Sequence, residues 1–292
     1  MRFTDNPFDV KRSARDAARV RREIGRLFGA VPTARIVLAP ALLAPLRQLF
    51  SAAHVDRLIL TSDEYYAARH FPELAVESVP AARLVARVAA TKPGAVIASV
   101  VSWHGAALPV PALFAGIRRA LGARAPLLVA DYTHAGAIGF PPVASLGADI
   151  VGGDPEKWLL PPKHGSRLAF LWMRSAVMFR TAARLFSPCF LAIDGAVDSR
   201  SARWIDPAAL SETAEWLAAA GLTRRALLER HQANLQMKRR LARRLGIPPG
   251  DDSSVLWTNR PIPTTLDRRL TRRGLVWRAA DGHTRILCRS DP

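Results

Sequence analysis

Short apolar segments alternate with helical segments from residue 34 to residue 174, and this alternation restricts the fold more than any other feature. Apolar runs of strand length occupy residues 34–40, 56–64, 94–102, 125–132, 147–153 and 166–174. Apolar residues at helical spacing fill the stretches 42–53 and 111–123 between them, and residues 77–90 combine a strand end with a helix. Such alternation predicts an α/β fold with a mostly parallel central sheet and helices on both faces.

The chain changes in character on either side of this region. Residues 9–29 have the apolar spacing of a helix, and Gly29 can end it. After about residue 180 the pattern is mainly helical, and short strands and a helix then follow from 253 to 290. We therefore expect an N-terminal helix (1–30), a large domain (31–180), and a linker with a small α+β C-terminal domain (181–292).

Composition excludes several classes of protein. The net charge of +18, from 42 Lys and Arg against 24 Asp and Glu, would attract polyanions, so nucleic-acid binding is kept as an alternative. Most of these charges are arginines spread along helices, as on a solvated surface, so we expect no nucleic-acid partner. The two cysteines, Cys189 and Cys288, have no metal or redox spacing, and we expect no metal. The N-terminus lacks a secretory h-region and no run is long enough to span a membrane, so we expect a cytoplasmic protein.

One segment, residues 129–174, concentrates the chemistry. Asp131 ends a buried strand, His134 follows in a glycine-containing turn, and Lys157 follows the next strand. Ligands of open α/β sheets bind at the carboxyl ends of the strands, so these three side chains should face one crevice. Each residue alone has an ordinary explanation: a helix N-cap, a structural histidine or a surface lysine. Their combination in one order is more specific.

An acid, an imidazole and a lysine are the groups that a pyridoxal-phosphate (PLP) site requires. The lysine forms a Schiff base with the cofactor aldehyde, and the acid keeps the pyridine nitrogen protonated, which makes the ring an electron sink. Burial and cationic neighbours should lower the pKa of the lysine so that it can attack as the neutral amine.

The segment resembles the aminotransferase class V family of fold-type I PLP enzymes, in its isopenicillin N epimerase-like and kynureninase-like branch. The matching motifs are Asp131-Tyr-Thr-His134-Ala, Gly147-Ala-Asp149, Lys157-Trp-Leu159 and, with His164 inserted, Pro162-Lys163-Gly165. The resemblance implies that Lys157 carries the cofactor as an internal aldimine. It also implies that Asp131 pairs with the pyridine nitrogen and that His134 approaches the phenolic oxygen.

Weaker similarity implies further site residues. Tyr66, or alternatively Tyr65, would stack on the cofactor ring. Ser102, Trp103 and His104 would border the site, Ser102 and His104 toward the cofactor and Trp103 toward the substrate. Arg285, with Arg289 as its nearest competitor, would bind the substrate carboxylate with a bidentate fork.

The sequence also departs from the family. It begins near the helix that leads into the sheet, as if shortened at the N-terminus. Ala39, Pro40, Ala41, Leu42 and Leu43 stand where the family places small hydroxyl residues around the phosphate. Asp154, Pro155 and Glu156 precede the lysine where the family has a histidine. The Gly-Thr element that touches the partner's phosphate is absent; Arg200 or Arg203 is a substitute.

The resemblance implies a PLP-dependent enzyme that acts on an amino acid, with PLP as cofactor. Transamination, elimination, epimerisation and kynureninase-like side-chain cleavage remain open, so the enzyme is a transferase, a lyase or a related type. The family also implies a homodimer with the active site at the interface. The altered phosphate cradle motivates the alternative, a degenerate PLP-fold protein that serves as a non-catalytic binding or partner subunit.

Overall fold

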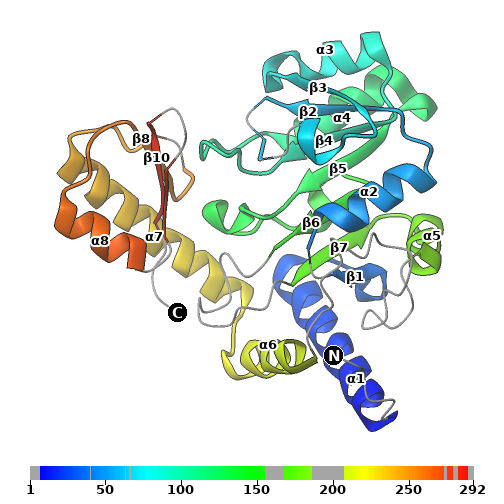
Figure 1. Cartoon of the computed structure of the whole chain (residues 1–292), viewed down its shortest axis with the longest axis horizontal. Coiled ribbons are helices and arrows are strands. Elements are labelled where there is room, and N and C mark those ends of the chain that lie inside the picture. Colours follow the sequence, from blue (N-terminus) through cyan, green and yellow to red (C-terminus); the bar gives the residue numbers. More distant parts are fainter. Residues whose placement is uncertain are drawn as a thin grey trace.

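A large mixed sheet and a small antiparallel sheet organise the chain (Figure 1). The computed structural model describes residues 7–39, 41–62, 64–65, 68–154, 168–185, 207–250, 252–272, 275–278 and 282–288. The large sheet contains β1 (Ile36–Ala39), β2 (Arg57–Thr61), β3 (Ala75–Val79), β4 (Ala95–Ser99), β5 (Leu127–Asp131), β6 (Ile150–Gly153) and β7 (Ala169–Met173). Its strand order is β1-β7-β6-β5-β4-β2-β3.

Five neighbouring strands of the large sheet, β3, β2, β4, β5 and β6, run parallel. Only β7 is reversed, since it pairs antiparallel with both β6 and β1. The edge strand β1 therefore points the same way as β5, and the carboxyl ends of β1, β2, β4, β5 and β6 lie at one edge. This edge is where an open α/β sheet binds its ligands.

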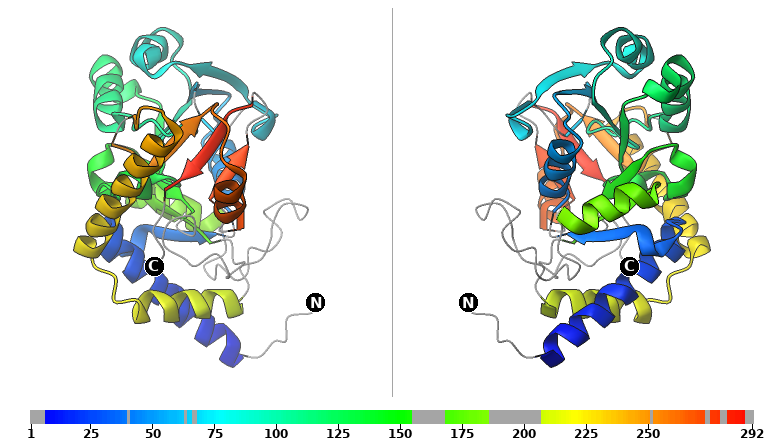
Figure 2. Two further views of the ribbon diagram at one scale, coloured as in Figure 1. Left: turned by 90° about the vertical axis from the view of Figure 1, so that its left-hand side faces the viewer. Right: turned by 90° about the vertical axis from the view of Figure 1, so that its right-hand side faces the viewer.

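Helices cover both faces of the large sheet (Figure 2). Helices α3 (Ala81–Thr91) and α4 (Val110–Leu121) pack against each other on one face. Helices α2 (Leu43–Ala52) and α5 (Ala176–Leu185) pack against each other on the opposite face. Right-handed crossovers explain this division. The connection from β1 to β2 crosses the sheet in one direction, and the connections from β3 to β4 and from β4 to β5 run in the opposite direction.

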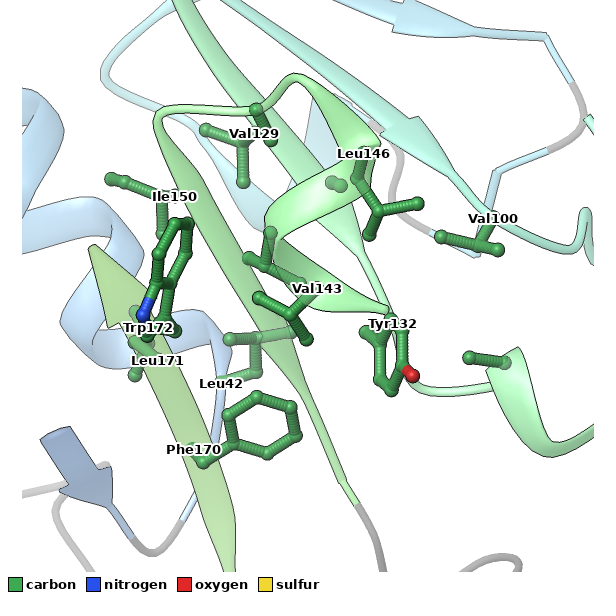
Figure 3. Close-up of a cluster of buried hydrophobic side chains, with 14 of the residues drawn as sticks. Leu42, Val100, Val129, Tyr132, Val143, Leu146, Ile150, Phe170, Leu171 and Trp172 are labelled. Carbon is green, nitrogen blue, oxygen red and sulfur yellow. The ribbon is translucent and has the colours of Figure 1, made fainter. Parts of the chain in front are cut away.

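The strands of the large sheet are apolar over nearly their whole length because both faces are covered. Every residue of β1, β4, β6 and β7 is buried. Figure 3 shows one part of this core, where Phe170 and Trp172 of β7 lie near Ile150 of β6 and near Val143 of the short 3-10 helix Val143–Leu146 that precedes β6. Removal of this much apolar surface from water is the main force that stabilises the sheet.

Helix α1 (Pro7–Phe28) packs against α6 (Pro207–Ala219) and reaches the start of β1. Its last residue, Phe28, is fully buried and stacks on Phe140 and Phe170, with ring centroids 4.9 and 5.6 Å away. Gly29 follows with φ of +63°, the left-handed conformation in which glycine commonly ends a helix. The helix expected at 9–29 is thereby confirmed.

The small sheet consists of β8 (Val255–Thr258), β10 (Thr284–Leu287) and β9 (Val276–Arg278), in that order and all antiparallel. Helix α7 (Arg224–Leu245) packs against β8, and α8 (Thr264–Arg272) packs against β9. The sheet also contacts the loops that follow β4 and β5 (Figure 1). Ser254 N–H donates to the carbonyl oxygen of Ala137 at 2.8 Å, and a Cβ on Gly105 would lie 2.6 Å from Val255 Cγ1.

The expected fold class is confirmed: an α/β protein with a mostly parallel sheet and a small C-terminal antiparallel unit. The sequence analysis did not identify α5, which directly follows β7. In the part of the chain that the structure describes, no helix combines the length and apolar character needed to cross a membrane.

Candidate functional site at the carboxyl edge of the sheet

Asp131 is the last residue of β5 and lies between the ends of its neighbours. It pairs with Ser99 of β4 on one side and with Gly152 of β6 on the other. Only 6% of Asp131 is exposed, and its Oδ1 accepts a hydrogen bond from the Thr133 N–H at 2.8 Å. That bond fixes the carboxylate at the strand end, as the sequence analysis expected for an acid at this position.

The turn after β5 is packed tightly against the end of β6. A Cβ placed on Gly153 would lie 2.8 Å from the carbonyl carbon of Tyr132 and 2.9 Å from the nitrogen of Thr133. Both contacts are to backbone atoms, so no side chain can move aside to relieve them. Glycine at position 153 therefore allows the Asp131–His134 turn to sit directly against β6.

A second carboxyl group, that of Glu64, lies beside Asp131, and the sequence analysis missed it. Its Oε1 accepts a hydrogen bond from the Ser99 N–H at 2.6 Å. The hydroxyl groups of Ser99 and Thr61 also donate to this carboxyl group. Since β2 ends at Thr61, the side chain of Glu64 supplies the acceptor that the next residue of a longer strand would have provided to β4.

The environment of Glu64 disfavours its negative charge. Burial, and then repulsion from Asp131, raise its pKa to about 7 against the opposing effect of its hydrogen bonds to Ser99 and Thr61. The signal that could have found this group was an acid three residues after the end of β2, in Leu-Thr-Ser-Asp-Glu64.

Arg285 of β10 brings the small sheet to the same edge. Only 1% of it is exposed, and its Nη1 lies 3.2 Å from His134 Nε2. Because a guanidinium can only donate, Nε2 of His134 accepts this bond, which places the proton of a neutral ring on Nδ1. The structure thus joins two predicted site residues that are 151 positions apart.

The Arg285 guanidinium is buried, but the structure gives hydrogen bonds for only part of it. Its Nε and Nη2 have no hydrogen-bond partner among the described residues. Burial lowers the pKa of Arg285 to about 10, although the charge of Asp131 acts in the opposite direction. The group remains a cation at neutral pH, and its buried Nε and Nη2 carry three N–H donors that have no partner among the described residues.

Trp103 lies against the Arg285 guanidinium, whose central carbon is 4.4 Å from the centre of the Trp103 ring. Tyr65, which is 52% exposed, contacts Trp103, and the two ring centroids are 5.5 Å apart. Trp103 and Tyr65 therefore form an aromatic boundary at the end of β4.

The neighbours of Trp103 point elsewhere. Ser102 is buried, and its hydroxyl accepts a hydrogen bond from the Ala106 N–H at 3.0 Å, which holds the turn 102–106 closed. His104 is exposed and lies against Trp257 of β8, with ring centroids 4.6 Å apart. The structure therefore shows Ser102 and His104 in contacts within the turn and with the small sheet.

Several predicted residues lie outside the described residues: Lys157, Tyr66, Arg289, Arg200, Arg203 and the Pro162–Gly165 motif. The motif Gly147-Ala-Asp149 is described, and it has a structural role. Asp149 forms an ion pair with Arg118 of α4 at 2.5 Å and accepts a hydrogen bond from the Leu128 N–H. This acid joins α4 to the amino ends of β5 and β6, at the edge of the sheet opposite Asp131.

Several solved structures share this architecture, and PLP-binding enzymes are among them. The cystine C-S lyase C-DES superposes with a TM-score of 0.65 at 17% identity over 96% of this chain and 83% of that chain. Ureidoglycine–glyoxylate aminotransferase from Bacillus subtilis gives 0.64 at 15% identity, over 96% and 84%. Histidinol-phosphate aminotransferase from Sinorhizobium meliloti, in complex with pyridoxal 5′-phosphate, gives 0.62 at 16%, over 96% and 82%.

The chain has the fold of fold-type I PLP enzymes. At these identities the superposition establishes the fold and leaves the activity of this chain to be proposed. No family model and no curated protein matches the sequence.

Proposed function

We propose that this chain binds PLP at the carboxyl edge of its large sheet and acts on an amino acid. The observation that carries the proposal is the meeting of Asp131, His134 and Arg285 at one point of a PLP-enzyme fold. Asp131 is buried at the end of β5, and Arg285 hydrogen bonds to His134 while two of its nitrogens have no partner among the described residues. A buried cation with unused donors is suited to an anionic ligand.

The ring end of the cofactor fits this arrangement. Asp131 would pair with the protonated pyridine nitrogen, and His134, whose Nε2 is held by Arg285, would approach the phenolic oxygen. Tyr66, or Tyr65, would cover the ring, and Lys157 would bind the cofactor covalently. When bound, PLP supplies an electron sink for a carbanion at the substrate α-carbon.

The phosphate end would be held by the backbone. Helix α2 begins at the carboxyl end of β1, at the same edge as Asp131, and its N-terminal N–H groups can hold an anion. Leu42, its N-cap residue, makes no capping hydrogen bond, and Pro45 removes one donor from the first turn. A phosphate with so few donors needs additional ones, so the proposal includes a homodimer whose partner supplies arginines, with Arg200 and Arg203 as candidates.

Arg285 would bind the substrate carboxylate through Nε and Nη2. These two nitrogens form one edge of the guanidinium, whose central carbon lies 4.4 Å from the centre of the Trp103 ring. A carboxylate must then approach in the plane of the group, which fixes the direction of the α-carbon. The reaction that follows, whether transamination, elimination, epimerisation or side-chain cleavage, stays open within this proposal.

Absorption and covalent labelling test the proposal together. The purified protein mixed with PLP should develop a visible absorption band, and borohydride should then attach the pyridoxyl group to Lys157. The Lys157→Ala variant is the control and should lose the label. A label on Lys163 would refute the assignment of Lys157, and no band at all would favour a non-catalytic PLP-fold protein.

A further inference from the structure

The carboxyl group of Glu64 has no part in the proposed roles, although it lies at the same edge of the sheet as Asp131. It is anchored from three directions, by Thr61 at the end of β2 and by the backbone and side chain of Ser99 at the end of β4. Ser99 pairs in register with Asp131 on β5. Adjacent strands lie about 4.8 Å apart, so Glu64 and Asp131 occupy neighbouring positions along one sheet edge.

We propose that Glu64 is a positioning residue of the cofactor site, which releases its proton when a cationic pyridine ring binds at Asp131. This inference rests on the proposed function. The proton goes to solvent, and no bond to the cofactor forms or breaks. In the complex, ionised Glu64 adds negative charge beside Asp131, and this charge favours the protonated form of the pyridine ring.

The surrounding charges give the direction of this coupling. In the free protein, Asp131 repels a charge on Glu64, and burial acts in the same direction, so the pKa of Glu64 is raised to about 7. Thr61 and Ser99, its other contacts, do not titrate in this range. The positive charge of Arg285 of β10 attracts the negative charge of Asp131. A pyridinium that neutralises Asp131 removes the repulsion, and the pKa of Glu64 falls in the complex.

Linkage then sets the dependence on pH. Because the complex holds fewer protons than the free protein, cofactor affinity should rise with pH up to about 7 and level off above it. Each unit by which the pKa of Glu64 falls on binding corresponds to about a tenfold gain in affinity across that interval. If Glu64 serves only as a substitute strand acceptor, no such gain is expected.

The probe is 4′-deoxypyridoxine 5′-phosphate, which carries the ring and the phosphate but has no aldehyde and cannot react with Lys157. Its affinity and its proton release are measured by titration calorimetry of the full chain between about pH 5.5 and 8, in buffers of different ionisation enthalpy. The variant is Glu64→Gln, and the matched control is Glu77→Gln on β3, a partly exposed acid paired with Arg87. Ionisations of the probe itself are common to all three proteins.

We expect the wild type and Glu77→Gln to release more protons than Glu64→Gln near pH 6.5, and to gain up to about tenfold in affinity relative to it by pH 7.5. If the probe binds and all three proteins release the same number of protons, the role of Glu64 is overturned and the proposed function is not. No binding by the wild type at any pH would overturn the proposed function as well. If Glu64→Gln does not fold, infrared difference spectra of the wild type decide: a protonated carboxyl band that the probe removes supports the inference, and an unchanged band contradicts it.

Discussion

Replacing Glu64 by Gln should make the stability of the protein less dependent on pH, even with no cofactor present. Glutamine keeps the length of the side chain and an acceptor for the Ser99 N–H, and it cannot ionise. In the wild type, the pKa of Glu64 is raised from 4.5 to about 7, chiefly by burial and then by Asp131. The folded protein therefore holds this proton more tightly than the unfolded chain does.

The sign and the magnitude follow from that difference in pKa. A raised carboxyl pKa contributes stability that is complete below pH 4.5 and is lost as the pH rises through about 7. Taken over the whole shift, the loss is about 3 kcal/mol, and most of it falls between pH 5 and pH 8. Glu64→Gln should thus gain about that much stability relative to the wild type over this interval.

Urea unfolding followed by circular dichroism at several pH values would measure the effect. The quantity of interest is the difference in the free energy of unfolding between variant and wild type, because titrating groups that do not interact with Glu64 cancel from it. Glu77→Gln is the control. The pKa of Glu77 is lowered by Arg87, so its titration lies below this interval and its curve should run parallel to that of the wild type. A difference for Glu64→Gln that stays constant from pH 5 to pH 8 would refute the argument.

Three other substitutions test the site and its support. Arg285→Lys keeps the charge but loses the fork and the contact with Trp103, so KM for an amino-acid substrate should rise by the equivalent of about 1–3 kcal/mol while the absorption spectrum with PLP is retained; an effect of Arg289→Lys in its place would show that the carboxylate assignment is shifted. Asp131→Ala should weaken PLP binding, measured by absorption titration, and remove nearly all activity, because the pyridine nitrogen loses its partner; near-normal turnover would mean that the site is misplaced. Gly153→Ala puts a methyl group against the backbone of Tyr132 and Thr133 and should destabilise the protein by about 1–3 kcal/mol in urea unfolding, and an unchanged midpoint would contradict the tight packing of the turn.

The sequence by itself determined most of the order of the elements and the position of Asp131 at the end of a strand. Buried parallel strands are continuous apolar runs and helices have a period near 3.6 residues, so each could be recognised locally. Asp131 could be placed at a strand end for the same reason, since the apolar run Leu127–Ala130 stops at an acid. The roles of Lys157 and Tyr66 came from the resemblance and stay predictions.

Only the tertiary structure decided which side chains meet at that site. Glu64 reaches Ser99, 35 residues away, because β2 ends before β4 and leaves a backbone donor to be satisfied. Arg285 reaches His134 across 151 residues because β8, its neighbour in the small sheet, packs on the loops after β4 and β5. The local spacing of apolar residues does not show which distant side chains will be in contact. They depend on how whole layers pack, and burial, which sets the pKa of both Glu64 and Arg285, is a property of that packing.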